Sequence, residues 1–252
     1  MAPMNDESKV VVDGIGKRFE GRQSVQALED VSFGVEDGKF VCIVGPSGCG
    51  KTTLFRIIAG LETATSGEVR LAGKPVQGPG TDRGMVFQGY GLFPWRTVSG
   101  NVAFGLEQQG LSEAEREARV EEMLDLVGLT EFADAYPKAL SGGMKQRVGI
   151  ARALAVDPET LLMDEPFGSL DAQTRGLLHE ELLSVWDETG KTVLFVTHDV
   201  GEAVTLADRI VVMAPSPGRV QEIVDVDLKR PREPTDNAFA EQVAHVRSLI
   251  SE

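Results

Sequence analysis

The sequence predicts an α/β fold with a mostly parallel sheet. Short apolar runs, typical of strands buried on both faces, alternate with segments of helical periodicity. One such run, Phe40–Val44, leads through a glycine-rich loop into a helical pattern. A third observation is a mainly helical stretch from about residue 89 to 155, which indicates a helical subdomain inserted into the α/β core.

Composition narrows the classes of protein that this chain can belong to. Its 252 residues, 42% of them hydrophobic, suit one large domain or a domain with an insertion. The net charge of −14 disfavours broad electrostatic binding to nucleic acid or anionic lipid. The two cysteines, Cys42 and Cys49, suggest neither a disulfide framework nor a zinc site, so a reducing cytoplasm is the expected setting. Residues 1–8 lack the apolar stretch of a secretory signal, and no apolar run approaches the ~20 residues of a membrane span.

The glycine-rich loop is the most informative motif. A strand, a glycine loop and a helix in this order form a cradle for phosphate, because the loop N–H groups and the positive helix N-terminus point at the anion. Lys51 would reach the outer phosphates, and the Thr52 hydroxyl would coordinate Mg²⁺. The predicted phosphate-binding loop consists of Gly45, Pro46, Ser47, Gly48, Cys49, Gly50, Lys51 and Thr52. The flanking strand and helix make nucleotide binding the favoured interpretation over a chance match.

The remaining strands follow from alternation and from apolar runs. Val31, Phe33 and Val35 alternate with polar residues, and Glu68–Leu71 does the same, which predicts half-buried strands in a small N-terminal antiparallel β part. Four further apolar runs predict fully buried strands: Met85–Phe87, Leu161–Met163, Val193–Val196 and Ile210–Met213.

Capping signals define the helices of the insertion. Ser112 and Glu115 form a capping box, followed by apolar residues at roughly helical spacing. Those residues are Leu111, Ala114, Ala118 and Val127. A second helix is predicted from Gly142 to about Val156, because Asp157-Pro158 forbids its continuation.

These boundaries predict the domain organisation. Residues 1–88 and 156–228 form the α/β core with its β part, 89–155 the inserted helical subdomain, and 229–252 a linker and C-terminal helix. In that helix an apolar face is formed by Phe239, Val243, Val246 and Ile250. We expect this face to pack on the chain's own body, with a partner or regulatory surface as the alternative.

Two carboxylates and a histidine follow predicted strands. Asp164 and Glu165 end the run that begins at Leu161, where an acid could reach the magnesium of a bound nucleotide and a second could orient or deprotonate a water. Turns favour acids, so the pair is ambiguous without the phosphate-binding loop. His198 follows Val193–Val196 at the sheet edge where ligands gather, although a lone histidine is more often structural.

A second candidate anion site opens the helix that starts at Gly142. Ser141 would cap this helix, and Gly142 and Gly143 would expose free N–H groups at its positive end. Alone, Ser-Gly-Gly is an ordinary turn before a helix.

In this order, the motifs resemble those of the ATPase subunit of ATP-binding-cassette (ABC) transporters, over roughly Val10 to Ile250. The resemblance implies a P-loop nucleotide-hydrolase fold that binds ATP and Mg²⁺. It makes Gly45–Thr52 the Walker A loop, continued by Thr53, and places Phe19 where an aromatic ring stacks on the adenine.

The resemblance also assigns roles to the other motif residues. Gln88 matches the glutamine that links the γ-phosphate and metal site to the membrane partner, and Leu140–Met144 matches the signature motif. Asp164 and Glu165 match the Walker B aspartate, a metal ligand, and the catalytic glutamate. Ser169–Asp171 matches the D-loop and His198 the switch histidine.

Two departures from the family pattern are Met144, where glutamine is usual, and Ser169, where alanine is usual. Both spare the Ser-Gly-Gly backbone and Asp171, so hydrolysis is still expected.

The resemblance further implies partners. Two ATPase subunits, expected to be identical, would hold ATP between the Walker A loop of one and the signature helix of the other. The region Gln88–Asn101 would contact a transmembrane permease, on the cytoplasmic side of the cell membrane. A periplasmic or extracellular solute-binding protein would act indirectly, and no nucleic acid is expected.

Two segments favour one branch of importers. Leu92–Val98 and Met213–Arg219 resemble those of ATPases for nitrate, aliphatic sulfonates and taurine, with pyrimidine or flavin precursors as alternative solutes. The aromatic cluster in Leu92–Val98 could instead merely pack the insertion. An ATPase acting on DNA is disfavoured by the acidic charge and by the lack of sustained heptads between Gly45 and Ser141. A regulatory cassette without turnover is disfavoured by the presence of Glu165 and His198.

Overall fold

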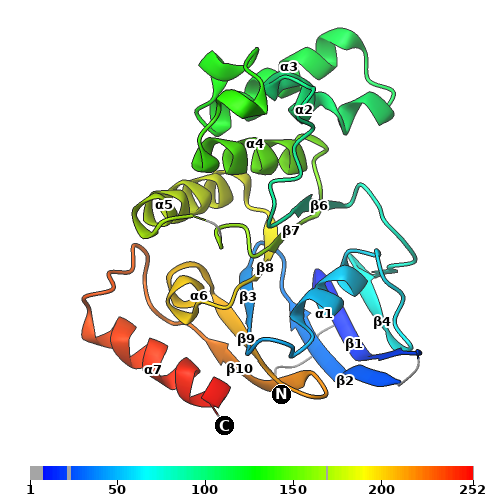
Figure 1. Cartoon of the computed structure of the whole chain (residues 1–252), viewed down its shortest axis with the longest axis vertical. Helices are drawn as coiled ribbons and strands as arrows, with labels where there is room; N and C mark the ends of the chain where they lie inside the picture. The colour runs from blue at the N-terminus through cyan, green and yellow to red at the C-terminus, as the bar shows by residue number, and fades with distance from the viewer. Residues whose placement is uncertain (1–7, 22–23, 169, 252) are drawn as a thin grey trace. The chain divides into compact units, whose positions relative to one another are not determined.

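The computed structural model describes residues 8–21, 24–168 and 170–251. The chain divides into two compact units, Met1–Gly80 with Lys191–Glu252, and Thr81–Gly190 (Figure 1). The second unit is wider than the predicted insertion 89–155, because strands and a helix of the predicted core cluster with it; the narrower boundaries stay a prediction. No helix in the described ranges has the length and apolar character needed to cross a membrane.

The first unit contains an antiparallel sheet with the strand order β2-β1-β4-β5. Its strands are β1 (Val10–Phe19), β2 (Val25–Val35), β4 (Ser66–Leu71) and β5 (Lys74–Pro75). β1 pairs antiparallel with both β2 and β4. Inward residues of β2, such as Val31, Phe33 and Val35, are buried, which confirms the small antiparallel part that alternation predicted.

The first unit also contains strands in the order β10-β9-β3-β8. They are β3 (Phe40–Val44), β8 (Thr192–Val196), β9 (Arg209–Ala214) and β10 (Arg219–Asp225). β3 runs parallel to β8 and β9, and every residue of β3 and β8 is buried. This confirms the parallel sheet that the apolar runs predicted. β10, which is largely exposed and antiparallel to β9, was not predicted.

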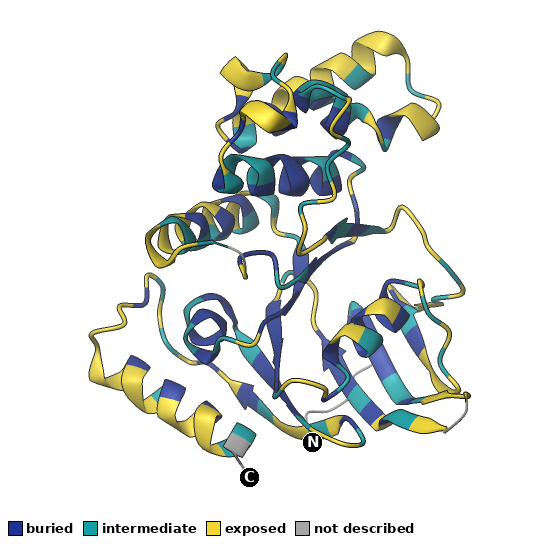
Figure 2. Cartoon of the chain, in the orientation of Figure 1, coloured by how far each residue is buried: buried dark blue, intermediate teal, exposed yellow. Residues whose placement is uncertain are grey.

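The helices of the first unit, in its described residues, are α1 (Lys51–Ile58), α6 (Val200–Leu206) and α7 (Asn237–Ser251). α7 packs on α6 and β9 and presents alternating buried and exposed faces (Figures 1 and 2). Phe239, Val243 and Val246 are buried, whereas Ile250 is only partly covered. The C-terminal face therefore packs on the chain's own body, as expected.

Two arginines fix the segment before α7. The buried Arg232 guanidinium donates to the carbonyls of Val204 (2.6 Å), Ala207 (2.7 Å) and Val226 (3.2 Å), and so satisfies carbonyl groups at the C-terminal end of α6. Arg230 donates to the Asp208 carboxylate at 2.8 Å. Burial, with the charge of Arg230 nearby, lowers the pKa of Arg232 to about 10. The predicted linker is thus held by its own cations.

The second unit contains the parallel strands β6 (Arg83–Val86) and β7 (Thr160–Asp164). Its helices are α2 (Val98–Ala103), α3 (Glu113–Leu126), α4 (Gly142–Ala155) and α5 (Ala172–Thr189), with 3₁₀ turns η1 (Leu106–Gln108), η2 (Thr130–Phe132) and η3 (Pro137–Ala139). α2, α3 and α4 pack on one another, and α4 has a long buried face (Figure 2). α4 ends at Ala155, before Asp157-Pro158, as predicted.

The N-terminus of α3 is as predicted, but its apolar face is different. Ser112 and Glu115 form the capping box. Ala114 and Ala118, expected on the apolar face, are exposed, whereas Val127 just after the helix is buried as expected. The buried residues are instead Val120, Met123 and Leu124. Larger side chains bury more apolar area per residue, so they decide which face of the helix turns inward.

We predict that Arg232→Met lowers the free energy of unfolding by about 2–4 kcal/mol, because several buried carbonyls lose their donor. Urea unfolding followed by circular dichroism measures the change. Arg219→Met, at an exposed position of β10, is the matched control and should shift stability little. Equal stability of both variants would show that Arg232 does not hold α6 and the segment before α7 together.

Candidate functional site

The glycine-rich loop connects β3 to α1 and leaves the start of α1 open. The N-cap of α1 is Gly50, which has no side chain to cap the helix, and no acidic residue lies in the first turn. Helices α2, α3, α4, α5 and α6 are each capped by a side-chain oxygen. The backbone N–H groups at the start of α1 therefore remain available to an anion.

The loop glycines are required for two different reasons, a left-handed backbone or a lack of space for a side chain. Gly48 has φ +82°, which strains any other residue, although the space around it is open. A Cβ on Gly45 would lie 2.6 Å from the Met213 carbonyl oxygen. A Cβ on Gly50 would lie 2.6 Å from Leu28 Cδ2. The loop is thus closely packed on one side and open beside Gly48. A ligand can contact the loop backbone directly on the open side.

Lys51 places a cation in this cradle. Its side chain is only 8% exposed, and its ammonium donates to the carbonyls of Gly45 (2.7 Å) and Pro46 (3.1 Å). The neighbouring Thr52 is exposed. A lysine ammonium, a helix N-terminus and unoccupied N–H donors form a donor set that suits a polyphosphate. The exposed Thr52 hydroxyl suits a hard cation bound to the same phosphates.

His198 lies at the same sheet edge as the loop. β3 and β8 are parallel, with Ile43 paired to Val196, so both strands end at this edge. Beyond them, the Thr197 N–H donates to the Ile43 carbonyl at 3.2 Å. The exposed His198 follows directly. The structure thus brings the loop and the predicted switch histidine to one edge of the first unit.

Phe19 lies at the end of β1 and is 41% exposed. Lys17 Nζ lies 4.9 Å from the centre of the Phe19 ring, and it also donates to Glu62 Oε1 and to the Thr63 carbonyl, both at 2.7 Å. The lysine therefore covers one face of the ring, and a base could stack only on the other face. The adenine contact of Phe19 stays a prediction.

In the second unit, the structure brings Gln88 close to Glu165. β6 and β7 are parallel, with Val86 paired to Met163, so Gln88 and the acidic pair follow strands that end at one edge. A Cβ built on Gly168 would lie 3.7 Å from Gln88 Nε2 and 3.8 Å from Glu165 Oε2. The amide and the carboxylate thus flank Gly168, and their roles in hydrolysis stay a prediction.

Glu165 also has an unusual backbone. Its φ is +42°, in the left-handed region that costs a non-glycine residue about 1–3 kcal/mol. Its carbonyl accepts from the Gly168 N–H at 3.2 Å, which closes the turn after β7. Strain of this kind persists where the surroundings hold a side chain in place, and it is common at active sites.

The signature motif forms the start of α4. The exposed Ser141 caps the helix by accepting from the Met144 N–H at 3.2 Å. A Cβ on Gly142 would lie 2.8 Å from Leu170 Cδ2, and one on Gly143 would lie 3.3 Å from Thr174 Cγ2. The two glycines thus permit close packing of α4 on the start of α5 as well as exposing N–H groups.

Asp171 caps α5. Its carboxylate accepts from the backbone N–H (3.0 Å) and the hydroxyl (2.7 Å) of Thr174, and these hydrogen bonds lower the pKa of Asp171. Ser169, the first residue of the predicted D-loop, lies outside the described residues.

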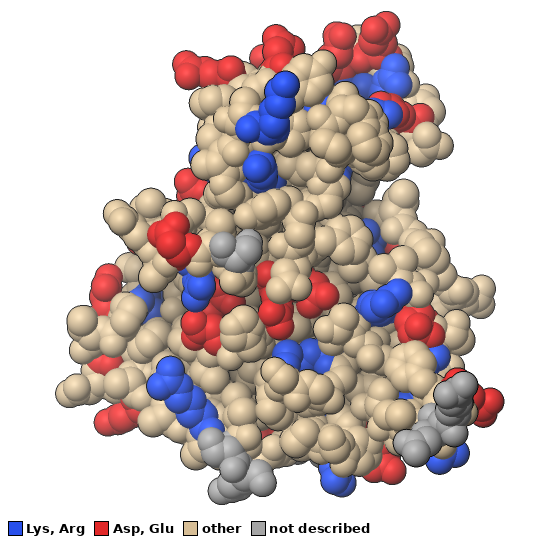
Figure 3. Space-filling view, in the orientation of Figure 1, with Lys and Arg blue, Asp and Glu red and all other residues tan. Residues whose placement is uncertain are grey.

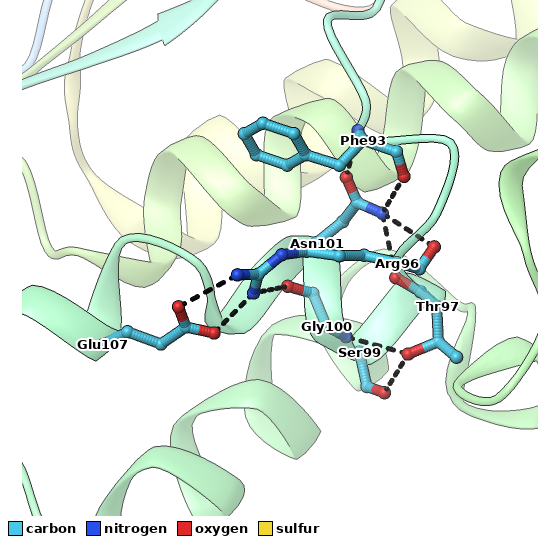
Figure 4. A network of polar contacts seen from close by, with 7 residues as sticks. All are labelled: Phe93, Arg96, Thr97, Ser99, Gly100, Asn101 and Glu107. Atoms are coloured by element: carbon cyan, nitrogen blue, oxygen red, sulfur yellow. Dashed lines mark hydrogen bonds and ion pairs between the residues drawn. The ribbon is translucent and has the colours of Figure 1, made fainter.

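The sequence did not predict the network that fixes residues 90–101 (Figure 4). Asn101 is fully buried, and its amide nitrogen donates to the carbonyls of Phe93 (3.2 Å), Arg96 (3.2 Å) and Thr97 (2.9 Å). Its side-chain oxygen accepts from the Phe93 N–H at 2.8 Å. One side chain thus replaces the hydrogen bonds that regular secondary structure would supply.

Cations complete this network. Arg96 pairs with both carboxylate oxygens of Glu107, and this hydrogen bonding lowers the pKa of Glu107 and raises that of Arg96. Arg152 of α4 donates to the carbonyls of Tyr90 (3.2 Å) and Gly91 (2.6 Å), while burial lowers its pKa. Residues 90–101 are therefore tied both to themselves and to the signature helix.

Comparisons with known proteins agree with this arrangement. A family model described as ABC transporter matches residues 28–168. The nitrate import ATP-binding protein NrtD of Synechocystis is 51% identical over 90% of this chain and 85% of its own length. The taurine import ATP-binding protein TauB of Rhizobium johnstonii is 48% identical over 90% of each chain. A dimeric ATP-binding cassette, MJ0796, solved with ADP and Pi, superposes with a TM-score of 0.74 at 34% identity over 87% of this chain and all of that chain.

The fold, the phosphate cradle at α1 and these relatives lead to one conclusion. The chain belongs to the ABC transporter family and is an ATP-binding ATPase of that family.

Proposed function

We propose that this ATPase powers import of a small anion, such as nitrate, taurine or another sulfonate, from the cytoplasmic side of the cell membrane. The observation that carries the ATPase role is the uncapped N-terminus of α1 beside the buried Lys51 ammonium. The anion assignment is supported by the relatives that are named for nitrate and taurine import, and by the segments Leu92–Val98 and Met213–Arg219. Another small solute, such as a pyrimidine or flavin precursor, is the alternative.

We assign each motif residue a separate role in binding or hydrolysing ATP. The loop Gly45–Thr53 and Lys51 would bind the phosphates of ATP, and Thr52, Gln88 and Asp164 would hold Mg²⁺. Bound Mg²⁺ would neutralise phosphate charge. Glu165 would orient and deprotonate the attacking water, and His198 would hydrogen-bond the γ-phosphate.

Two copies of the chain would close on ATP. The first turn of α4 presents Ser141 and two glycines at a helix N-terminus, which is a second anion site that ATP bound to another copy could fill. MJ0796, the cassette solved with ADP and Pi, is dimeric. ATP bound between the two copies would stabilise the dimer, and hydrolysis of the ATP would let the copies separate.

The aromatic surface of residues 93–104 would contact a membrane permease. Trp95 is 71% exposed and Phe104 39% exposed, although the Phe93 ring lies against both, with centroids 5.7 and 4.4 Å away. Apolar rings on a fixed backbone suit docking against a partner. The solute-binding protein would meet the permease, not this chain.

An acidic groove adjoins this surface. A cavity of about 610 Å³ between α2 and α3 is lined by Glu113, Glu117, Glu121 and Asp134, which outnumber Arg116 there. Acidic side chains gather over α3 in Figure 3. The permease segment that lies in this groove is therefore expected to be basic.

We predict that Glu165→Gln keeps ATP binding but lowers phosphate release at least about 100-fold, because the general base is lost. With Mg²⁺ and ATP, the variant should sediment as a dimer. Glu188→Gln, on the exposed face of α5, should keep normal turnover. Near wild-type turnover of Glu165→Gln, or monomers that still carry ATP, would contradict the assigned roles.

We predict that Lys51→Ala weakens ATP binding at least about tenfold, because the buried ammonium no longer faces the phosphates. Titration calorimetry measures the affinity. Lys74→Ala, which removes an exposed lysine of β5, is the control for lost positive charge. If Lys51→Ala bound ATP with unchanged affinity, the assignment of Gly45–Thr52 as the phosphate-binding loop would be wrong.

We predict that Asn101→Leu leaves basal ATP turnover within about twofold but increases hydrogen exchange of residues 92–97, because four hydrogen bonds are lost. The stimulation of ATP turnover by the reconstituted permease should also be weaker in Asn101→Leu than in the native chain. Ser99→Ala, which keeps the Asn101 network, should match the native chain in both assays. Normal exchange in Asn101→Leu would show that the segment is held by other contacts.

A further inference from the structure

A cavity of about 290 Å³ lies between α4, α5 and the turn after α3, and none of the motif residues lines it. Its walls are mainly apolar: Ile150 comes from α4, and Leu178, Leu182 and Val185 come from α5. All four of these side chains are buried. Water against these four side chains finds few hydrogen-bond partners, so an apolar group would replace it favourably there.

The guanidinium of Arg147 lines the cavity. Arg147 Nη1 donates to the Val127 carbonyl at 2.9 Å, and its buried Nε lies 3.4 Å from Glu181 Oε2 without a hydrogen bond. The guanidinium is fixed on one side, and its Nη2 makes no hydrogen bond within the part of the chain that is described. A ligand in the cavity can therefore offer an acceptor to a positioned donor.

The charges around the cavity set the class of ligand. Asp125 and Glu181 both line it, so the carboxylates outnumber the single guanidinium of Arg147. An anion would meet net negative charge, whereas a neutral carbonyl or amide could accept from Arg147 without this repulsion. The volume lies near the lower end of the ~300–1,000 Å³ typical of ligand pockets, which indicates a molecule with one or two rings.

We propose that this cavity is an accessory binding site for a small, uncharged, mainly apolar molecule with one carbonyl or amide acceptor. The site lies next to the signature motif. Leu178 lines the cavity, and its Cδ1 would lie 3.6 Å from a Cβ on Gly143. A bound molecule thus touches the side chain on which the first turn of α4 packs.

The test uses 4-fluorobenzamide as the probe and fluorine NMR line broadening as the readout, with the full chain free of nucleotide. Ser184 is exposed on α5 and lines the cavity, so the indole of Ser184→Trp should block the opening without disturbing the core. Leu177→Trp adds the same indole at an exposed position of α5 that does not line the cavity. We expect broadening with the native chain and with Leu177→Trp, and its loss with Ser184→Trp.

A second probe tests the class of ligand. 4-Fluorobenzoate has the same ring but a negative charge, so it should broaden less than the amide at equal concentration. No broadening of the amide at millimolar concentration, equal broadening with all three chains, or stronger broadening of the benzoate would each overturn the proposal. Because no nucleotide is present, these outcomes are independent of the proposed transport function.

Discussion

The site depends on one electrostatic arrangement, the uncapped start of α1 beside the Lys51 ammonium. In each of the helices α2 to α6, the side chain of the N-cap residue accepts a hydrogen bond from a backbone N–H of the first turn. α1 leaves this task to a ligand, and Lys51 is held against the loop carbonyls by hydrogen bonds of 2.7 and 3.1 Å. A polyphosphate satisfies both the donors and the cation at once, so its binding completes the local structure.

Parallel strands explain how distant residues meet at the site. In the first unit, β3 and β8 end at one edge of the sheet. This brings Gly45 and His198 to the same edge, although 152 residues separate them in the sequence. In the second unit β6 and β7 end at one edge, which brings Gln88 to Glu165. Within each unit, strand register thus brings predicted site residues to one sheet edge.

Sequence patterns predicted the features that local chemistry decides. The glycine loop, the caps at Ser112 and Ser141 and the buried strands β3 and β8 each follow from a few neighbouring residues, whereas Phe87, expected in a buried strand, is exposed. The patterns missed what tertiary contacts decide. Asn101 looks like an ordinary polar residue in a short helix, yet it is fully buried and binds three carbonyls. Arg232 stood in a segment that resembled a linker, yet it satisfies carbonyls at the end of α6, which no local pattern reveals.

The Asn101 network separates the backbone path of residues 93–97 from the chemistry of their side chains. The Asn101 side chain bonds to main-chain atoms of Phe93, Arg96 and Thr97. Backbone groups are the same whatever side chains these residues carry. The exposed ring of Trp95 can therefore be replaced by another side chain while the path of the segment stays fixed. Under the proposed docking on a permease, one backbone path can thus present different side chains to different partners.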